Sequence, residues 1–334
     1  MKAYEIVSDG GIDALALNER PDPKPGPGEV LVRVRASSIN YRDLSTIEDP
    51  VPRNIPYPRI PNSDGAGDVV EVGAGVTRWK TGDKVCGCFF QGWQDGDITP
   101  EIMGRALGGT VDGMLAEYVV LREDGLVAMP AHLSYEEAAT LPCAALTAWV
   151  SLVEKGKVKA GETVLLLGTG GVSVFALQFC KLMGVRTICT SSSDEKIARL
   201  KQMGADEVIN YRTHPEWQER VLDLTGGRGV DHTVEVGGAG TLERSIAATR
   251  VTGSIGLIGV LTGGTVNPVM IMRKSIRLQG IYVGSRRVFE DMNAAISQHG
   301  LKPVISETYD FADARQAFHA MRAAGHFGKL VVRL

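Results

Sequence analysis

One short stretch constrains the fold of this chain more than any other: Thr163-Val-Leu-Leu-Leu-Gly-Thr-Gly-Gly-Val-Ser173. Its first half, 163–167, is a continuous apolar run of strand length, and apolar residues then recur at helical spacing up to Met183. A strand therefore turns into a helix at the glycines, where the missing Cβ atoms let a ligand reach the backbone and the first helical N–H groups. This arrangement suits a pyrophosphate. The predicted contacts at this corner are Gly168, Thr169, Gly170, Gly171 and Val172.

The glycine pattern is incomplete by itself, since Ser173 stands where the last glycine is usual, and a strand-turn-helix corner without a ligand is the alternative. The surrounding sequence supports the ligand interpretation, because strands and helices continue to alternate. Strands are predicted over 163–167, 185–190, 207–210, 230–236 and 254–260, and helices over 172–183, 194–203, 215–224 and 241–248. Alternation of this kind predicts an α/β fold with a parallel sheet covered by helices on both faces.

The flanking regions show a different pattern. Short strands predicted over 29–36, 68–73 and 83–87, with Gly- and Pro-rich turns between them, indicate a barrel-like β domain. Residues 89–115 are expected to form a long loop, either a lid or a surface excursion. Ser134 and Glu137 form a capping box, and an apolar helix is expected over 145–153. Near the C-terminus we expect a strand over 276–283, a helix over 288–298 and a strand over 329–333 that completes the β domain.

Composition excludes several classes of protein. With 44% apolar and 22% charged residues the chain resembles soluble globular proteins, and a net charge of −3 gives no reason to expect binding to nucleic acid or membranes. Glu5 interrupts any signal-peptide pattern, and the five cysteines do not form a disulfide framework in a chain of this size. We therefore expect a cytoplasmic protein with reduced cysteines.

Several separated motifs, in this order, resemble the medium-chain dehydrogenase/reductase superfamily. They are Pro25-Gly-Pro-Gly-Glu-Val-Leu-Val32, Pro61-Asn-Ser-Asp-Gly-Ala-Gly-Asp-Val-Val-Glu-Val-Gly73, Gly82-Asp-Lys-Val85, Ala139-Thr-Leu-Pro-Cys-Ala-Ala-Leu-Thr-Ala-Trp149, the glycine corner and Gly328-Lys-Leu-Val-Val332. Within that superfamily the chain looks most similar to the zinc-independent, quinone oxidoreductase-like branch. The resemblance implies a GroES-like β-barrel domain (1–130 and 284–334), a Rossmann domain (131–283) and an active site in the cleft between them.

The resemblance also decides what to expect of metals. Zinc-bearing members of the superfamily hold the ion with a cysteine, a Gly-His-Glu segment and a later cysteine; the matching positions here are Asn40, Ser63, Asp64 and Cys143. Zinc prefers nitrogen and sulfur donors, and all six histidines follow residue 131. A structural zinc lobe is also not expected, since only Cys86 and Cys88 fall in that region. We therefore expect no metal in the site.

Without a Lewis acid, oxidation of a simple alcohol is difficult, whereas hydride transfer to a quinone or an α,β-unsaturated carbonyl produces a delocalised oxyanion that hydrogen bonds can stabilise. We expect such a reductase. The alternatives are a zinc-free NADP-dependent alcohol dehydrogenase and a cofactor-binding protein with vestigial catalysis. The predicted catalytic residues are Asn40 and Tyr41, with Asp43 bracing their loop; Asn40 as a turn cap and Tyr41 as a half-buried packing residue are the structural alternatives.

The cofactor is expected to be NADP(H), because Ser191 stands at the position where NAD-preferring relatives keep an acidic residue. Asp194 is expected to favour the helix N-terminus after the N-cap Ser193. Lys196, Tyr211 and Arg212 match residues that face the 2′-phosphate in relatives. Further cofactor contacts implied by the resemblance are Ser191, Ser192, Ser193, Gly237, Gly238, Ile258, Val260, Val283, Ser285, Phe327 and Lys329. A homodimer pairing sheet edges near 279–283 is also expected.

Overall fold

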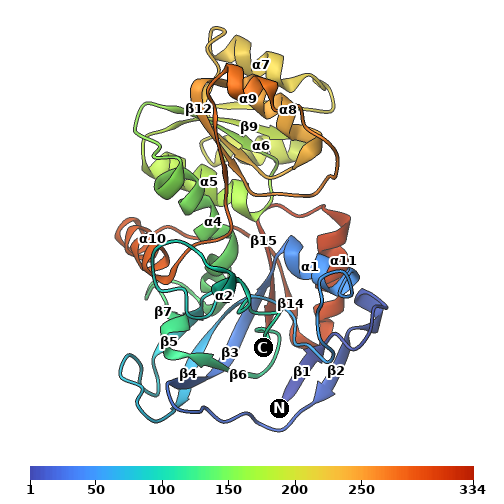
Figure 1. Ribbon diagram of the computed structural model, residues 1–334, viewed down its shortest axis with the longest axis vertical. Helices are drawn as coiled ribbons and strands as arrows, with labels where there is room; N and C mark the ends of the chain where they lie inside the picture. The colour runs from blue at the N-terminus through green and yellow to red at the C-terminus, as the bar shows by residue number, and fades with distance from the viewer. The chain divides into compact units, whose positions relative to one another are not determined.

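The strand and helix predicted at the glycine corner are present as β8 (Thr163–Leu167) and α5 (Gly171–Leu182) in a computed structural model that describes residues 1–334. They belong to one of two units into which the chain divides. The parallel-sheet unit is Thr147–Tyr282, and the β-rich unit is Met1–Leu146 with Val283–Leu334 (Figure 1).

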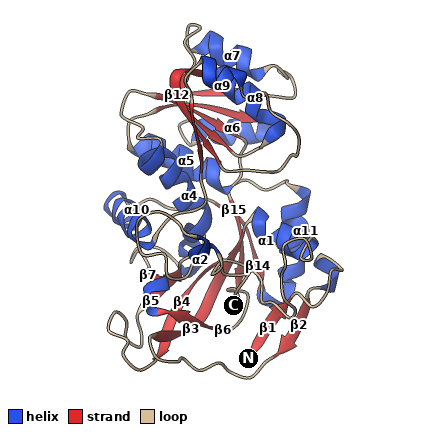
Figure 2. Cartoon of the chain, in the orientation of Figure 1, coloured by secondary structure: helices blue, strands red, loops and turns tan.

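The parallel-sheet unit contains one six-stranded sheet in the order β10-β9-β8-β11-β12-β13, with every neighbouring pair parallel. Helices pack around this sheet (Figure 2), which confirms the α/β prediction. Its remaining elements are β9 (Arg186–Ser191), α6 (Asp194–Gln202), β10 (Glu207–Asn210), α7 (Trp217–Leu224), β11 (Val230–Glu235), α8 (Ala239–Ala248), β12 (Thr249–Leu257), α9 (Val269–Arg273) and β13 (Arg277–Gly280).

Two predicted elements of this region differ from the structure. The strand expected over 276–283 is only Arg277–Gly280, because its neighbour β12 ends at Leu257, opposite Gly280. Val283 also has φ 58°, a left-handed conformation that a strand does not accommodate. The helix expected over 145–153 is regular only in α4 (Leu146–Trp149), with wider π-helical turns before and after it. Pro142 lies in the first of these turns and has no N–H to donate to a regular helical ladder.

The β-rich unit is built on the long strand β3 (Glu29–Ile39), in which buried Val30, Val32 and Val34 share one face and Arg33 and Arg35 lie on the other. The main sheet has the order β14-β15-β3-β4-β5-β7, and β6 also pairs with β3. The unit also contains β1 (Lys2–Glu5), β2 (Ala16–Glu19), α1 (Tyr41–Glu48), β4 (Asp64–Val72), β5 (Lys84–Gly87), α2 (Pro100–Met103), β6 (Tyr118–Arg122), β7 (Leu126–Ala128), α3 (Tyr135–Ala138), α10 (Arg286–His299), β14 (Ile305–Asp310), α11 (Ala314–Ala323) and β15 (Lys329–Arg333).

The C-terminal strand completes the N-terminal sheet, as predicted. β15 runs antiparallel to β3, with Leu330 opposite Ile39, and parallel to β14. The capping box of Ser134 and Glu137 is also present at the start of α3. The C-terminal segment of the chain thus supplies β14 and β15 to the same sheet as the N-terminal strand β3.

Residues 89–115 are anchored to the unit rather than free of it. The segment contains the short helix α2, and its bridge between Phe90 and Ala106 holds its two arms together. Arg42 stacks over the Phe89 ring at 4.3 Å and donates to the Leu107 carbonyl at 2.5 Å. The segment therefore packs against the start of α1. None of the helices combines the length and the apolar character needed to cross a bilayer.

Candidate functional site

The glycine corner between β8 and α5 is open to a ligand. Gly168 has φ 72°, and no heavy atom lies within 4 Å of the place where a Cβ would stand at Gly168 or Gly170. Gly170 is the N-cap of α5, so the N–H groups of the first helical turn have no partner within the helix. An anionic group placed there would meet these N–H groups and the positive end of the helix dipole.

Ser173, which replaces the last glycine of the pattern, is accommodated by a hydrogen bond. It is buried, and its Oγ donates to the Leu167 carbonyl at 2.6 Å, at the end of β8. The side chain therefore lies between strand and helix, away from the open glycines. The substitution leaves the corner accessible.

The residues near the end of β9 that were predicted to contact the cofactor differ in solvent exposure. Ser191 is buried, and its carbonyl accepts from the Tyr211 N–H at 3.0 Å, while the Tyr211 ring is exposed. Ser193 caps α6 by accepting from the Lys196 N–H at 3.4 Å. Asp194 accepts from the Asn210 amide at 2.7 Å. Partial burial lowers the pKa of Lys196.

The end of β11 is connected to the following turn and to α8 through a buried carboxylate that the sequence analysis did not identify. Glu235 is fully buried; its Oε1 accepts from the N–H groups of Gly237 at 2.7 Å and Gly238 at 3.1 Å and from the Thr241 hydroxyl at 2.7 Å. Its Oε2 accepts from the Ser245 hydroxyl. An acidic residue ending a buried strand just before two glycines was the available signal.

The predicted contacts on β12 lie beside this carboxylate. The N–H groups of Ile258 and Gly259 donate to the Glu235 carbonyl at 2.8 and 3.1 Å. Val260 follows with 81% of its surface exposed, which is unusual for a valine in a well-packed unit. In open parallel sheets, ligands bind outside the carboxyl ends of the strands, which is where Gly237, Gly238, Ile258 and Val260 lie.

A second polar cluster lies in the β-rich unit, where the predicted catalytic Asn40 precedes α1. The Lys329 ammonium donates to Asn40 Oδ1 at 2.6 Å, and Asn40 Nδ2 approaches Ser63 Oγ at 3.4 Å. Ser63 Oγ in turn donates to Asp64 Oδ1 at 2.6 Å. Asp64 Oδ2 accepts from the Cys143 N–H at 3.1 Å. We call Asn40, Ser63, Asp64, Cys143 and Lys329 the polar cluster.

Asp43 holds the backbone of two members of this cluster in place. It is fully buried and accepts from the backbone N–H groups of Asn40 at 2.9 Å and of Ser63 at 3.3 Å. Burial raises the pKa of Asp43, the nearby Arg42 guanidinium opposes that rise, and Asp64 adds to it. Tyr41, the other predicted catalytic residue, is 48% exposed and takes no part in the hydrogen bonds of the cluster. About half of its surface is thus covered, so the structure leaves both interpretations of Tyr41 open, as a catalytic residue and as a half-buried packing residue.

The other residues of this unit that were predicted to contact the cofactor interact with neighbouring residues of the protein. Val283 is buried in its left-handed conformation, and Ser285 caps α10 by accepting from the Val288 N–H at 3.4 Å. Phe327 is buried, and its N–H donates to Ser306 Oγ at 3.3 Å. Lys329 has its ammonium on Asn40 and the Ile39 carbonyl. Within the β-rich unit, the structure thus joins two of the predicted site residues, Asn40 and Lys329.

The polar cluster does not fit a zinc ion. Nowhere in residues 1–334 do three or more His, Cys, Asp or Glu side chains converge as a metal site would need. Asn40 Oδ1, the atom that would replace a cysteine sulfur, is occupied by an ammonium that would repel a divalent cation. Burial raises the pKa of the Cys143 thiol, so the thiolate that binds zinc is disfavoured. Burial likewise raises the pKa of Cys88, to about 12.

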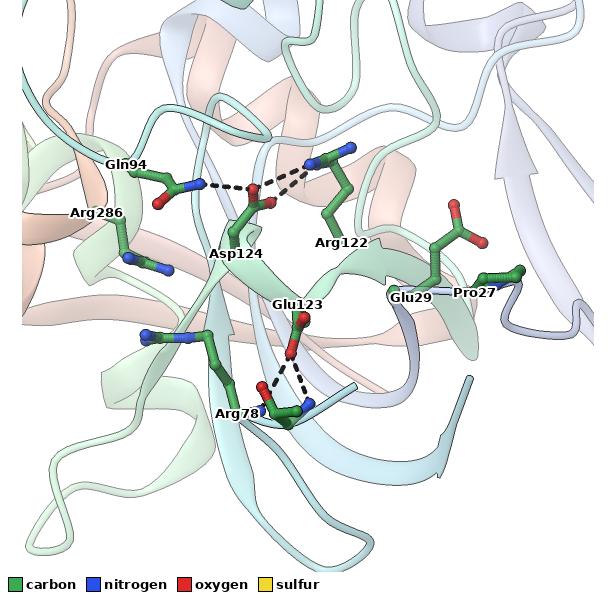
Figure 3. Close-up of a pocket in the computed structure, with 10 residues that line it drawn as sticks. Pro27, Glu29, Arg78, Gln94, Arg122, Glu123, Asp124 and Arg286 are labelled. Atoms are coloured by element: carbon green, nitrogen blue, oxygen red, sulfur yellow. Dashed lines mark hydrogen bonds and ion pairs between the residues drawn. The ribbon is translucent and has the colours of Figure 1, made fainter. Parts of the chain in front are cut away.

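A cavity lined by charged side chains lies in the β-rich unit apart from the polar cluster. Figure 3 shows this space of about 420 Å³, lined among others by Arg78, Arg122, Glu123 and Asp124. Arg122 pairs with Asp124 at 2.8 Å, and Glu123 accepts from the Arg78 N–H at 3.1 Å. Asp124 and Glu123 thus have partners, and the Arg78 guanidinium pairs with Glu290 at 2.9 Å. No residue of the polar cluster lines this cavity.

Comparisons with known proteins match both units. The family model for zinc-binding dehydrogenases matches residues 171–298, and that for the alcohol dehydrogenase GroES-like domain matches residues 26–131. A zinc-type alcohol dehydrogenase-like protein of Schizosaccharomyces pombe is 41% identical over 340 residues, which cover 98% of each chain. The crystal structure of an NAD-dependent alcohol dehydrogenase is 34% identical and matches with a TM-score of 0.92 over 100% of both chains.

Other similar proteins are named for different activities. A crotonyl-CoA reductase of Streptomyces collinus is 30% identical over 366 residues, 96% of this chain and 81% of the relative. A quinone oxidoreductase from Coxiella burnetii is 28% identical (TM-score 0.82, covering 100% and 99%), and a mycobacterial protein complexed with NADPH is 28% identical (TM-score 0.84, covering 100% of both). With its GroES-like unit, its parallel-sheet unit and these relatives, the chain belongs to the medium-chain dehydrogenase/reductase superfamily and is an oxidoreductase of that family.

Proposed function

We propose that this protein is an NADPH-dependent reductase that transfers a hydride to an α,β-unsaturated carbonyl or a quinone without a metal ion. The observation that carries the proposal is the polar cluster. Four of its members, Asn40, Ser63, Asp64 and Cys143, stand at the positions that match zinc ligands in relatives. They are joined by hydrogen bonds to one another and, through Asn40, to the buried ammonium of Lys329. Such a cluster offers hydrogen-bond donors to a developing oxyanion rather than ligands to a cation.

The glycine corner fits a nicotinamide nucleotide, because the space beside Gly168 and Gly170 is open and the N-terminus of α5 begins there. Residues 168–172 would hold the pyrophosphate. When bound, the reduced nicotinamide supplies the hydride. The N–H of Asn40 would donate to the substrate oxygen as negative charge develops there, and solvent or Tyr41 would provide the proton that completes the reduction.

Preference for the phosphorylated cofactor rests on charge. Ser191 brings no carboxylate to the end of β9, and the carboxylate of Asp194 is bonded to Asn210. Lys196, Tyr211 and Arg212 would face a 2′-phosphate. The mycobacterial relative in complex with NADPH supports this choice. The NAD-dependent alcohol dehydrogenase among the similar structures makes direct measurement of both cofactors necessary.

The similarity to crotonyl-CoA reductase and to quinone oxidoreductase supports the choice of electrophile. The test is oxidation of NADPH and of NADH, followed at 340 nm, with a panel of quinones, enals, enones and enoyl thioesters. We expect turnover with at least one of these classes and a higher kcat/KM for NADPH. Oxidation of secondary alcohols by NADP with no reduction of any conjugated carbonyl or quinone would instead favour an alcohol dehydrogenase. Tight NADPH binding without any turnover would indicate vestigial catalysis.

Metal independence has its own test. Dialysis against a strong chelator should leave kcat unchanged, and elemental analysis of the purified protein should find no stoichiometric zinc. Loss of activity that returns only with added zinc would contradict the proposal. Replacing Tyr41 by Phe then asks whether its hydroxyl supplies the proton; unchanged turnover would assign that role to solvent.

We also propose that the protein forms a homodimer through the edge strand β13. This strand ends the six-stranded sheet, so its outer N–H and C=O groups have no partner strand within the chain. Large apolar side chains nearby, including Met272 and Tyr282, are exposed. Light scattering should give twice the chain mass. Because the Ile281 N–H donates to the Leu257 carbonyl at the end of β12, strand alternation turns the Gly280 N–H to the outer edge of the sheet. A Gly280→Pro variant, which removes that outer N–H, should lower the mass to that of the monomer.

A further inference from the structure

We propose that Lys329 is a positioning residue that fixes the orientation of the Asn40 amide, so that Asn40 presents an N–H group to the substrate. The inference rests on the proposed function for its catalytic consequence. It assigns Lys329 to the polar cluster rather than to the cofactor phosphates, the role implied for it by the sequence resemblance.

The sheet brings the two residues together. β15 is antiparallel to β3 with Leu330 opposite Ile39, and the next step in that register places Lys329 opposite Asn40. Both residues stand where their strands reach the start of α1. The long lysine side chain therefore stays within the unit, and only 3% of Lys329 is exposed.

The hydrogen bonds leave one orientation for the Asn40 amide. An ammonium has only donors, so the atom 2.6 Å from Lys329 must be the amide oxygen. On the other side, Ser63 gives its proton to Asp64 at 2.6 Å, which leaves its Oγ as an acceptor facing Asn40 Nδ2 at 3.4 Å. If the Asn40 amide were flipped, its NH₂ group would face the Lys329 ammonium, and its oxygen would face a lone pair of Ser63 Oγ. Both neighbours therefore select the same orientation.

This orientation has a chemical consequence. Asn40 Nδ2 carries two hydrogens, and Ser63 takes one of them. The second can serve a substrate oxygen, and the ammonium on Oδ1 withdraws electron density from the amide, which strengthens that N–H as a donor. The ammonium also donates to the Ile39 carbonyl at 2.7 Å, which keeps it from turning away. The positive charge of Lys329 thus stabilises the negative charge on the substrate oxygen through the Asn40 amide, a role that a metal ion plays in zinc-dependent relatives.

The test compares Lys329→Met with Asn40→Asp, and uses Lys24→Met, at an exposed position, as the matched control. Lys329→Met removes the ammonium but keeps most of the side-chain length. Asn40→Asp keeps an oxygen for Lys329 and removes both N–H donors. For each variant we would measure the NADPH Kd by fluorescence titration without substrate, kcat and KM with the best electrophile, and thermal unfolding.

We expect Lys329→Met to bind NADPH within about threefold of the wild type and to lose about tenfold to a hundredfold in kcat, somewhat less than the loss from removing an oxyanion donor itself. Asn40→Asp should fold, bind NADPH and lose at least as much kcat, and the double variant should be no worse than Asn40→Asp, because Lys329 acts through Asn40. Lys24→Met should match the wild type.

Two results would overturn the inference. One is a tenfold or larger rise in NADPH Kd for Lys329→Met with kcat unchanged, which would place the ammonium on the cofactor. The other is wild-type kcat in Asn40→Asp, which remains decisive if Lys329→Met does not fold. Failure of the proposed function would look different: the wild type itself would reduce none of the electrophiles, while the Kd comparison would still report where Lys329 acts.

Discussion

The buried carboxylate of Glu235 gives the sharpest test of how the parallel-sheet unit holds its predicted cofactor loop. In Glu235→Ala, four donors lose their acceptor. The Gly237 N–H is partly exposed and can bind water, and the Thr241 hydroxyl has an alternative acceptor in the Gly238 carbonyl at 3.2 Å. Two buried donors, the Gly238 N–H and the Ser245 hydroxyl, remain without a partner.

An orphaned buried donor costs about 1–3 kcal/mol, so Glu235→Ala should lower the free energy of unfolding by about 2–6 kcal/mol. Glu235→Gln keeps an oxygen at the Oε1 position and lets the Ser245 hydroxyl accept from the new amide, so its loss should be only about 1 kcal/mol. The affinity for NADPH should fall about tenfold or more in Glu235→Ala, because the loop at Gly237 and Gly238 is no longer held for binding.

Urea unfolding and fluorescence titration of NADPH measure the two quantities. Glu243→Ala is the matched control, since this exposed glutamate lies on α8, the helix that carries Thr241 and Ser245, accepts from the Asn267 N–H and should change stability by about 0.5 kcal/mol or less. A Glu235→Ala protein within about 1 kcal/mol of the wild type would refute the reasoning, because it would mean that the orphaned groups find water or other partners.

Three further predictions concern pH, cofactor choice and the glycine corner. Burial, with a smaller contribution from Arg277, lowers the pKa of His232 to about 3, whereas the pKa in the unfolded chain is about 6.5. Between these values the unfolded chain binds a proton that the folded chain does not, so lowering the pH from 7 to 5 should reduce the free energy of unfolding of the wild type by about 2 kcal/mol more than that of His232→Gln. Equal losses for the two proteins in urea unfolding would contradict this. Lys196→Ala should raise the KM for NADPH about tenfold and leave that for NADH unchanged in initial-rate assays; parallel changes would remove the lysine from the 2′-phosphate site. Ser173→Ala should lose about 1 kcal/mol of stability, because its bond to Leu167 disappears, with NADPH affinity kept; a large loss of affinity would place Ser173 in the ligand site.

Much of the fold followed from local patterns. The apolar run at 163–167 and the helical spacing after it predicted β8 and α5, and the alternation beyond them predicted the parallel sheet, because strand and helix periodicities are written in neighbouring residues. Two boundaries differed from the prediction: β13 stops at Gly280, where its partner β12 ends, and wider turns interrupt the helix around α4.

The sequence by itself determined the open glycine corner, the loss of zinc-type ligands at Asn40 and Ser63 and the resemblance to an oxidoreductase family, since each depends on residue types at fixed positions along the chain. Only the tertiary structure decided the surroundings of Asn40 and the role of Glu235. Lys329 and Asn40 are 289 residues apart in the sequence, and they come into contact because β15 pairs with β3. No local sequence pattern encodes the register of that pairing. Long-range strand pairing thus placed the Lys329 ammonium on Asn40, a contact that the positions of the two residues in the sequence do not reveal.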